Sequence, residues 1–213
     1  MNDFSEAKIK ENCPHCDPTS FALKYPLEER DNFRVVCDVH PLIEGHILII
    51  PKRHLSCIGE YPQVFFEEFV KLFEKFSKFL KQIYNSVSSF EHGKIGQTVF
   101  HSHIHLLPFD GIPSQIVPEG KENLTAFSDF SYLKKVYDKL GKYLYFSIGD
   151  KRWIVDTKLA APRFFRDRFA KALSAPQRGN WKLMDADEKI MLEANKEIVN
   201  LRKNWELFSK SLS

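Results

Sequence analysis

The fold is decided by the stretch Gln97-Thr98-Val99-Phe100-His101-Ser102-His103-Ile104-His105-Leu106-Leu107-Pro108, which holds three histidines spaced by two. The apolar residues around them predict a β-strand over about 98–107. Because successive strand side chains point to opposite faces, His101, His103 and His105 are expected side by side on one face. Three imidazoles make a poor core, since each needs a polar partner when buried and two protonated rings repel each other. The pattern favours a site that uses neutral imidazoles as nucleophile, phosphate ligands or metal ligands.

The composition is that of a globular protein with a substantial core. The chain has 213 residues, 43% of them hydrophobic, and a formal net charge of +3. This weak charge gives no argument for a nucleic-acid surface but is compatible with an anionic small-molecule substrate. No apolar run approaches the roughly 18 residues of a transmembrane helix, and the N-terminus lacks an apolar signal core. We therefore expect a cytosolic protein without nucleic-acid or membrane partners.

The apolar pattern predicts two parts of different texture. The first has strands at 33–37, 46–51 and 87–91 and a long helix at 62–84, whose aromatic stripe at helical spacing indicates core packing. The second has helices at 130–140, 162–173 and 185–208, and two strands at 143–146 and 152–155 around a Gly149-Asp150 turn. We expect a polar leader at 1–12, a first domain at 13–110 and an extension at 111–213 that packs on it.

The run Cys13-Pro14-His15-Cys16 has the spacing of one half of a metal site. In a cytosolic chain a close cysteine pair favours a metal or redox role, and a pair of unligated thiols is the remaining alternative. A redox pair would need a strand-to-helix junction inside a βαβ unit, which the sequence does not provide. Zinc would need two further ligands, and spacing alone does not choose among the other histidines. His15 is a poor ligand candidate, because the residue between two ligands of so tight a loop usually points away.

Several segments together resemble the histidine triad (HIT) superfamily over about residues 12–110. They are Asp38-Val39-His40-Pro41, Gly45-His46-Ile47-Leu48-Ile49-Ile50-Pro51-Lys52-Arg53-His54, the long helix that follows, and Gly96 to Pro108 with the histidine triplet. The resemblance implies an α+β HIT fold, with an antiparallel β-sheet and a long helix, here followed by a C-terminal α/β extension. It also implies a homodimer formed through the long helix and the sheet edge.

The resemblance implies a reaction at the α-phosphorus of a nucleotide. In the family the middle histidine of the triplet attacks phosphorus and becomes a nucleotidyl-histidine, which water or another acceptor resolves. By position, His103 is the implied nucleophile, and His105 and His46 contact the phosphate. Further substrate contacts are implied for Gln97, Thr98, the Ser102 amide and, toward the ribose, Asp38. The apolar residues expected to wall the base are Phe33, Val36, Ile43 and Leu48.

The resemblance also implies a ligand set for structural zinc. In zinc-bearing members the N-terminal cysteine pair joins the histidine after the Pro-Lys-x-His step and the first histidine of the triplet. The implied ligands are therefore Cys13, Cys16, His54 and His101. The zinc would then brace the nucleophile from two residues away rather than take part in the chemistry.

One residue favours hydrolysis over transfer. Transferase branches carry Gln where this chain has His105, so the expected function is hydrolysis of dinucleoside polyphosphates or adenylylated small molecules. The alternatives are a phosphorylase or nucleotidyltransferase, and a nucleotide-binding protein with little turnover; a purely structural zinc protein would leave His103, His105 and His46 unexplained. The segment Glu91-His92-Gly93 departs from the Asn-containing family pattern and leaves the substrate open. A helix with Arg163, Arg166 and Arg168 either covers the site or forms a solvated basic face.

Overall fold

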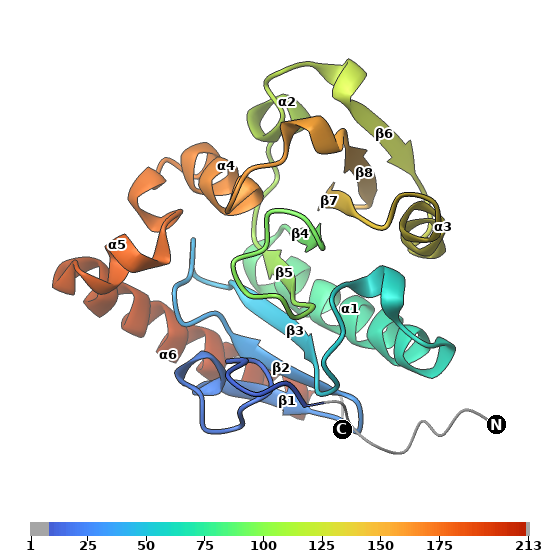
Figure 1. The fold of residues 1–213 in the computed structure, drawn as a ribbon. Coiled ribbons are helices and arrows are strands. Elements are labelled where there is room, and N and C mark those ends of the chain that lie inside the picture. Colours follow the sequence, from blue (N-terminus) through green and yellow to red (C-terminus); the bar gives the residue numbers. More distant parts are fainter. Residues whose placement is uncertain (1–8, 212–213) are drawn as a thin grey trace.

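The computed structural model describes residues 9–211, so residues 1–8 of the predicted leader lie outside the described part of the chain. Within that part, eight strands form one antiparallel sheet in the order β1-β2-β3-β5-β4-β7-β8-β6 (Figure 1). The strands are β1 (Pro26–Glu29), β2 (Phe33–Cys37), β3 (Ile47–Pro51), β4 (Ser88–Gly93), β5 (Ile104–Leu107), β6 (Leu124–Phe127), β7 (Tyr143–Ile148) and β8 (Lys151–Val155). The α-helices are α1 (Gln63–Tyr84), α2 (Pro113–Ile116), α3 (Ser131–Leu140), α4 (Phe164–Ala172), α5 (Trp181–Asp185) and α6 (Glu188–Lys210), and the short 3-10 helices include η1 (Phe21–Leu23) and η2 (Ile58–Glu60).

The predicted fold class is confirmed: an antiparallel sheet, one long helix, and additional helices at the C-terminal end. The segment after residue 110 continues the sheet rather than starting a new one. Strand β7 pairs with the whole of β4, from Ser88 opposite Ile148 to Gly93 opposite Tyr143, and β8 and β6 follow outward. One sheet therefore runs through the predicted domain 13–110 and the predicted extension 111–213, and the boundary between them stays a prediction.

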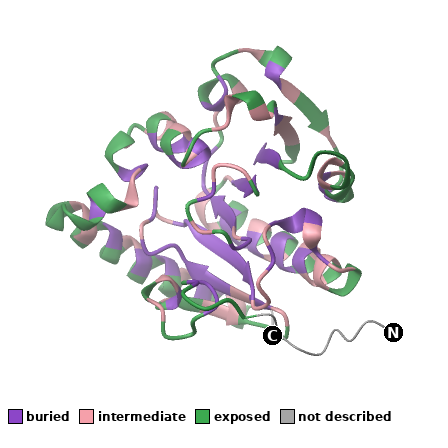
Figure 2. Cartoon of the chain, in the orientation of Figure 1, coloured by how far each residue is buried: buried purple, intermediate pink, exposed green. Residues whose placement is uncertain are grey.

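Helix α1 forms where apolar residues recur every three or four positions, and this apolar face packs on the sheet. The helix starts directly after Pro62 and ends at Tyr84, because the left-handed backbone of Asn85 (φ 62°) cannot continue it. Six of its side chains are buried: Phe69, Leu72, Phe73, Phe76, Phe79 and Leu80. The central strands beneath it are buried as well (Figure 2). The aromatic stripe is therefore core packing, as predicted.

Helix α6 covers another flank of α1. The indole of Trp205 stacks on Phe76 with ring centroids 4.2 Å apart, and its N–H donates to the Leu27 carbonyl at 2.8 Å. Helix α6 thus packs on part of α1, and β7 pairs with β4 of the same chain. The homodimer through the long helix and the sheet edge stays a prediction.

The opposite face of the sheet holds two smaller apolar clusters with His105 beside them. Strand alternation puts Val36, Leu48 and Ile50 on this face, where they cluster with Leu23. In the second cluster Phe90 packs with α4, and its ring stacks on the His105 ring with centroids 4.1 Å apart. The same alternation sends Phe33 to the α1 face, so its predicted place in the base wall is wrong.

Two strands, β1 and β6, were not predicted from the sequence. Strand β1 is short and half-exposed, and β6 lies in a stretch that reads as a loop because Pro118 and Gly120 precede it. Both are outer strands of the sheet, where weak apolar alternation suffices. Among the described residues, no helix has the length and apolar character to cross a membrane.

Candidate active site

The three histidines of the triplet do not share one strand. Strand β5 begins only at Ile104, so His101 and His103 lie in the segment before it, and the predicted strand from 98 was wrong at its start. The rings of His103 and His105 are still adjacent, with centroids 5.0 Å apart, whereas His101 turns toward the cysteine pair. The amide of Ser102 donates to the Leu55 carbonyl at 2.6 Å, which ties this segment to the loop after β3.

His103 is oriented by a hydrogen bond to its own chain. Its Nδ1 lies 2.6 Å from the carbonyl oxygen of His101. Because a carbonyl only accepts, Nδ1 carries the proton and Nε2 keeps its lone pair. Burial lowers the pKa of His103, so the ring is neutral near pH 7. A neutral imidazole with a free lone pair and a fixed proton is prepared for nucleophilic attack.

His46 and His105 form a relay whose proton positions follow from one backbone group. The Leu42 N–H donates to Nδ1 of His46 at 3.0 Å, so neutral His46 carries its proton on Nε2. That N–H donates to Nδ1 of His105 at 2.9 Å, which leaves the His105 proton on Nε2. Burial lowers the pKa of His46 to about 4 and that of His105 well below its usual value. The relay thus ends in a ring N–H of His105, a residue that lines the adjacent cavity.

Asp38 is paired with an arginine from the extension. The Arg166 guanidinium donates to Asp38 Oδ2 at 2.8 Å and to the His40 carbonyl at 2.7 Å, while Asp38 Oδ1 accepts from the His40 amide. Burial alone would raise the pKa of Asp38, but Arg166 and His46 outweigh it and hold that pKa below its usual range. Arg166 is therefore a buried member of the site, whereas Arg168 pairs with Glu119 at the surface.

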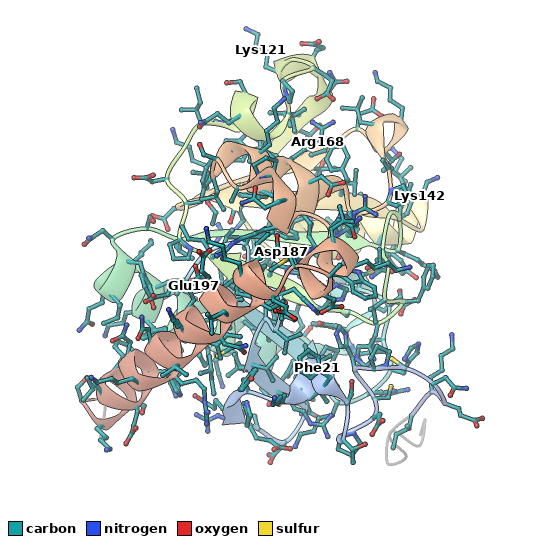
Figure 3. The ribbon with its side chains drawn as sticks, turned by 90° about the vertical axis from the view of Figure 1, so that its left-hand side faces the viewer. Phe21, Lys121, Lys142, Arg168, Asp187 and Glu197 are labelled. Atoms are coloured by element: carbon teal, nitrogen blue, oxygen red, sulfur yellow. The ribbon has the colours of Figure 1, made fainter. Side chains whose placement is uncertain are left out.

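A cavity of about 280 Å³ opens in front of the histidines. Its apolar wall comes from both ends of the chain, with Phe21 of η1 (labelled in Figure 3) and Trp181 of α5. The residues around it are Pro14, His15, Ser20, Phe21, Ala22, Asp38, Val39, His40, Leu48, Thr98, Val99, His103, His105, Arg166 and Trp181. Of the four predicted base-wall residues only Leu48 is among them. A larger hollow of about 720 Å³ between α1 and the β7–β8 turn has no histidine or cysteine in its lining.

Of the polar residues Gln97, Thr98 and Ser102, which are predicted to contact substrate, only Thr98 lines the cavity. Thr98 lines the cavity and is exposed to it. The Gln97 side chain is buried, with its amide donating to the Ser56 carbonyl at 2.7 Å. The Ser102 hydroxyl donates to the carboxylate of Glu91, and the Ser102 amide donates to the Leu55 carbonyl. The structure thus gives Ser102 partners within the protein in place of the substrate.

The four predicted zinc ligands come together. The Sγ atom of Cys16 lies 3.4 Å from Nδ1 of both His54 and His101, and the Cys13 thiol lies 3.4 Å from His101 Nδ1. All four ligand atoms lie within 4.8 Å of one another. Tetrahedral zinc with ordinary Zn–S and Zn–N bonds would separate such atoms by roughly 3.6 Å. The other nitrogen of His101 donates to the Pro51 carbonyl at 2.8 Å, the outer contact that fixes a metal-ligating imidazole. This donor set fits zinc.

Glu91 is buried behind the triplet, on the α1 face of the sheet. Its carboxylate accepts hydrogen bonds from the Ser102 hydroxyl at 2.8 Å, the Ile58 amide at 3.0 Å, and the Tyr143 hydroxyl. Burial raises the pKa of Glu91 to about 7, although the hydrogen bonds from Tyr143, Ser102 and Ile58 oppose the rise. Sequence reasoning noted Glu91 only as a departure from a family pattern, because spacing does not reveal that it joins three separate segments.

The Glu91 carboxyl should make stability depend on pH. Its folded pKa lies above its ordinary value of 4.5, so its contribution is fully present below pH 4.5 and is lost as pH rises through about 7. Relative to Glu91→Gln, which does not titrate, the unfolding free energy of the wild type should fall by roughly 2–3 kcal/mol between pH 5 and pH 8. Urea unfolding of both proteins at these two pH values measures this difference. An equal difference at both would contradict the assignment.

Comparison with known proteins points to one family. The HIT domain model matches residues 26–112. An adenosine 5′-monophosphoramidase from Candida albicans is 30% identical over 115 residues, covering 50% of this chain and 74% of the relative. An uncharacterised HIT-like protein from Borreliella burgdorferi is 35% identical over 91 residues, covering 39% of this chain and 65% of its own length. The chain thus spans a little under two thirds of that relative.

Parts of this chain are also similar to solved structures of histidine triad proteins. A hypothetical histidine triad nucleotide-binding protein from Sulfolobus tokodaii is 25% identical with a TM-score of 0.40, covering 47% of this chain and 71% of that one. A zinc-bound histidine triad family protein from Mycobacterium smegmatis is 26% identical with a TM-score of 0.35, covering 39% and 63%.

Proposed function

This chain belongs to the histidine triad (HIT) family, and from that premise we propose that it is a nucleotide hydrolase acting at the α-phosphorus through a covalent nucleotidyl-histidine. The bond cleaved is a phosphoanhydride or a phosphoramidate. The observation that carries the proposal is the hydrogen bond from His103 Nδ1 to the His101 carbonyl, which leaves Nε2 as a nucleophile in a residue that lines the cavity. The adenosine 5′-monophosphoramidases among the relatives support adenosine phosphoramidate as the first substrate to test.

The first step forms a bond between Nε2 of His103 and the α-phosphorus. The bond from phosphorus to the leaving group breaks, and the leaving group departs with the electron pair and takes a proton from water. The imidazole becomes positively charged, and its Nδ1–H remains hydrogen-bonded to the His101 carbonyl, which stabilises that charge. The Nε2–H of His105 donates to a phosphoryl oxygen as negative charge grows there.

The second step returns the enzyme to its starting state. Water attacks phosphorus, the P–N bond breaks, and its electron pair goes back to Nε2 of His103. The released nucleoside monophosphate and one proton leave the cavity. Thr98 and Asp38 are proposed contacts, with the ribose hydroxyls donating to the Asp38 carboxylate beside Arg166. Cys13, Cys16, His54 and His101 would hold zinc, which would supply a structural brace.

A substrate panel tests the proposed function. Adenosine phosphoramidate, a diadenosine polyphosphate and a nucleotide sugar are each incubated with the full-length protein, with and without inorganic phosphate. Production of nucleoside monophosphate that does not depend on phosphate is the expected result. A strict need for phosphate would make the protein a phosphorylase, and failure to cleave any of them, with AMP still bound, would make it a nucleotide-binding protein.

A further inference from the structure

His15 is a histidine near the proposed nucleophile that the predicted mechanism does not use. It lies between the two cysteines of the predicted zinc site but does not belong to the ligand cluster. Its ring packs edge-on against His103, with centroids 4.9 Å apart and planes at 71°, and against His101 at 5.5 Å. The side chain therefore points into the protein beside the nucleophile.

The tight turn of the cysteine loop explains this direction. The Cys16 and Asp17 amides both donate to the Cys13 carbonyl, at 3.0 and 3.1 Å, so the loop folds back on itself. Both thiols then face His101, and the His15 ring lies against the rings of His101 and His103. His15 therefore does not join the metal ligands, as predicted for a residue between two ligands of a tight loop. Its side chain instead lines the cavity.

Two observations separate His15 from an ordinary buried ring. Only 4% of the residue is exposed, and its Nδ1 is buried with no hydrogen-bond partner among the described residues. The ring nevertheless lines the same cavity as His103, His105 and Thr98. Buried polar groups are nearly always paired, so an unpaired ring nitrogen in a residue that lines a binding cavity points to a partner supplied by the ligand.

We propose that His15 is a substrate-contacting residue that gives a ring-nitrogen hydrogen bond to the phosphoryl group that His103 attacks. The inference rests on the proposed function, because it takes the scissile phosphoryl group to lie between His103 and His105. It adds His15, whose ring packs against the nucleophile, to the proposed roles of His46, His103 and His105. It also makes the cysteine loop a part of the substrate site, since the same turn holds two metal ligands and a substrate ligand.

The test compares three variants of the full-length protein. His15→Phe keeps an aromatic ring of similar shape and removes both nitrogens, and His15→Gln keeps a hydrogen-bonding group. Thr19→Ala is the control, since Thr19 is exposed on the same loop and lies outside the cavity lining. With adenosine phosphoramidate, His15→Phe should lower kcat/KM by about 100-fold, as loss of one donor to a reacting oxyanion does. Glutamine should restore part of the loss, and the control should match the wild type.

Zinc content and AMP binding make the outcomes distinguishable. Each variant is compared at equal zinc content, and AMP affinity is measured by calorimetry independently of turnover. Imidazole nitrogen NMR of the wild type adds a measurement that needs no variant: AMP should shift the His15 ring signals. A His15→Phe protein with wild-type kcat/KM and AMP affinity would overturn the proposal, as would His15 signals that AMP leaves unmoved. If the wild type turns over nothing yet AMP binding depends on His15, the proposed function fails and the contact stands.

Discussion

Replacing His103 with alanine should lower the rate of adenosine phosphoramidate hydrolysis by at least about 10⁴-fold, as removal of an enzyme nucleophile does. Alanine removes the proposed nucleophile, and His105 cannot take over. Its Nδ1 accepts from His46 and its Nε2 carries the proton, so neither nitrogen offers a free lone pair. Steady-state kinetics on the purified proteins measure the loss.

The fold of this variant should survive, which keeps the result interpretable. The His103 side chain lies at the edge of the cavity and makes its hydrogen bond to the preceding backbone, so its removal leaves the sheet intact. Zinc content should match the wild type. A rate within tenfold of the wild type, at equal zinc content, would rule out His103 as the nucleophile.

Replacing Cys16 with alanine should abolish zinc binding and destabilise the chain by several kcal/mol. The loss should be smaller than the roughly 10–16 kcal/mol of zinc-finger peptides, because an eight-stranded sheet holds most of this fold without metal. Activity should also fall, by about 10- to 100-fold, as it does when an outer contact of a site is lost. The metal cluster and the nucleophile are connected through His101. Its ring lies against the Cys16 thiol, and its carbonyl accepts the hydrogen bond from His103 Nδ1.

Cys37→Ala is the matched control for this experiment. Cys37 is a fully buried thiol in β2, packed against the α1 face and away from the four ligands. Its replacement should cost about 1–2 kcal/mol of stability and leave the zinc content at one ion per chain. Metal analysis and urea unfolding separate the two variants. Loss of zinc in Cys16→Ala with unchanged stability and activity would contradict the bracing role.

Local pattern was sufficient for much of the fold, and local pattern together with family resemblance was sufficient for the metal cluster. The α1 helix follows from apolar residues at helical spacing, and the strands at 33–37 and 143–146 follow from short apolar runs. Spacing indicated Cys13 and Cys16 as half of a metal site, the resemblance added His54 and His101, and the structure brings all four together. What these predictions share is that a periodic or recognisable local signal determines them.

The features that the sequence did not predict depend on contacts between segments far apart in the chain. Arg166 is 128 residues from Asp38 in the chain, and nothing in the spacing of α4 separates this inward arginine from the outward Arg168. The start of β5 was misplaced because a long-range bond from the Ser102 amide to Leu55 overrides the apolar alternation. His15 was set aside by a rule about metal ligands that says nothing of what lies on the far side of the loop.

The most direct test is to trap the covalent intermediate and find where it is attached. The protein is mixed with adenosine phosphoramidate, quenched in alkali to preserve a P–N bond, digested, and the modified peptide is sequenced by mass spectrometry. We expect an adenylyl group on His103, appearing within one turnover and disappearing as substrate is consumed. An adenylyl group on His105 or another residue, or turnover with no modified residue at any time, would contradict the nucleotidyl-histidine mechanism.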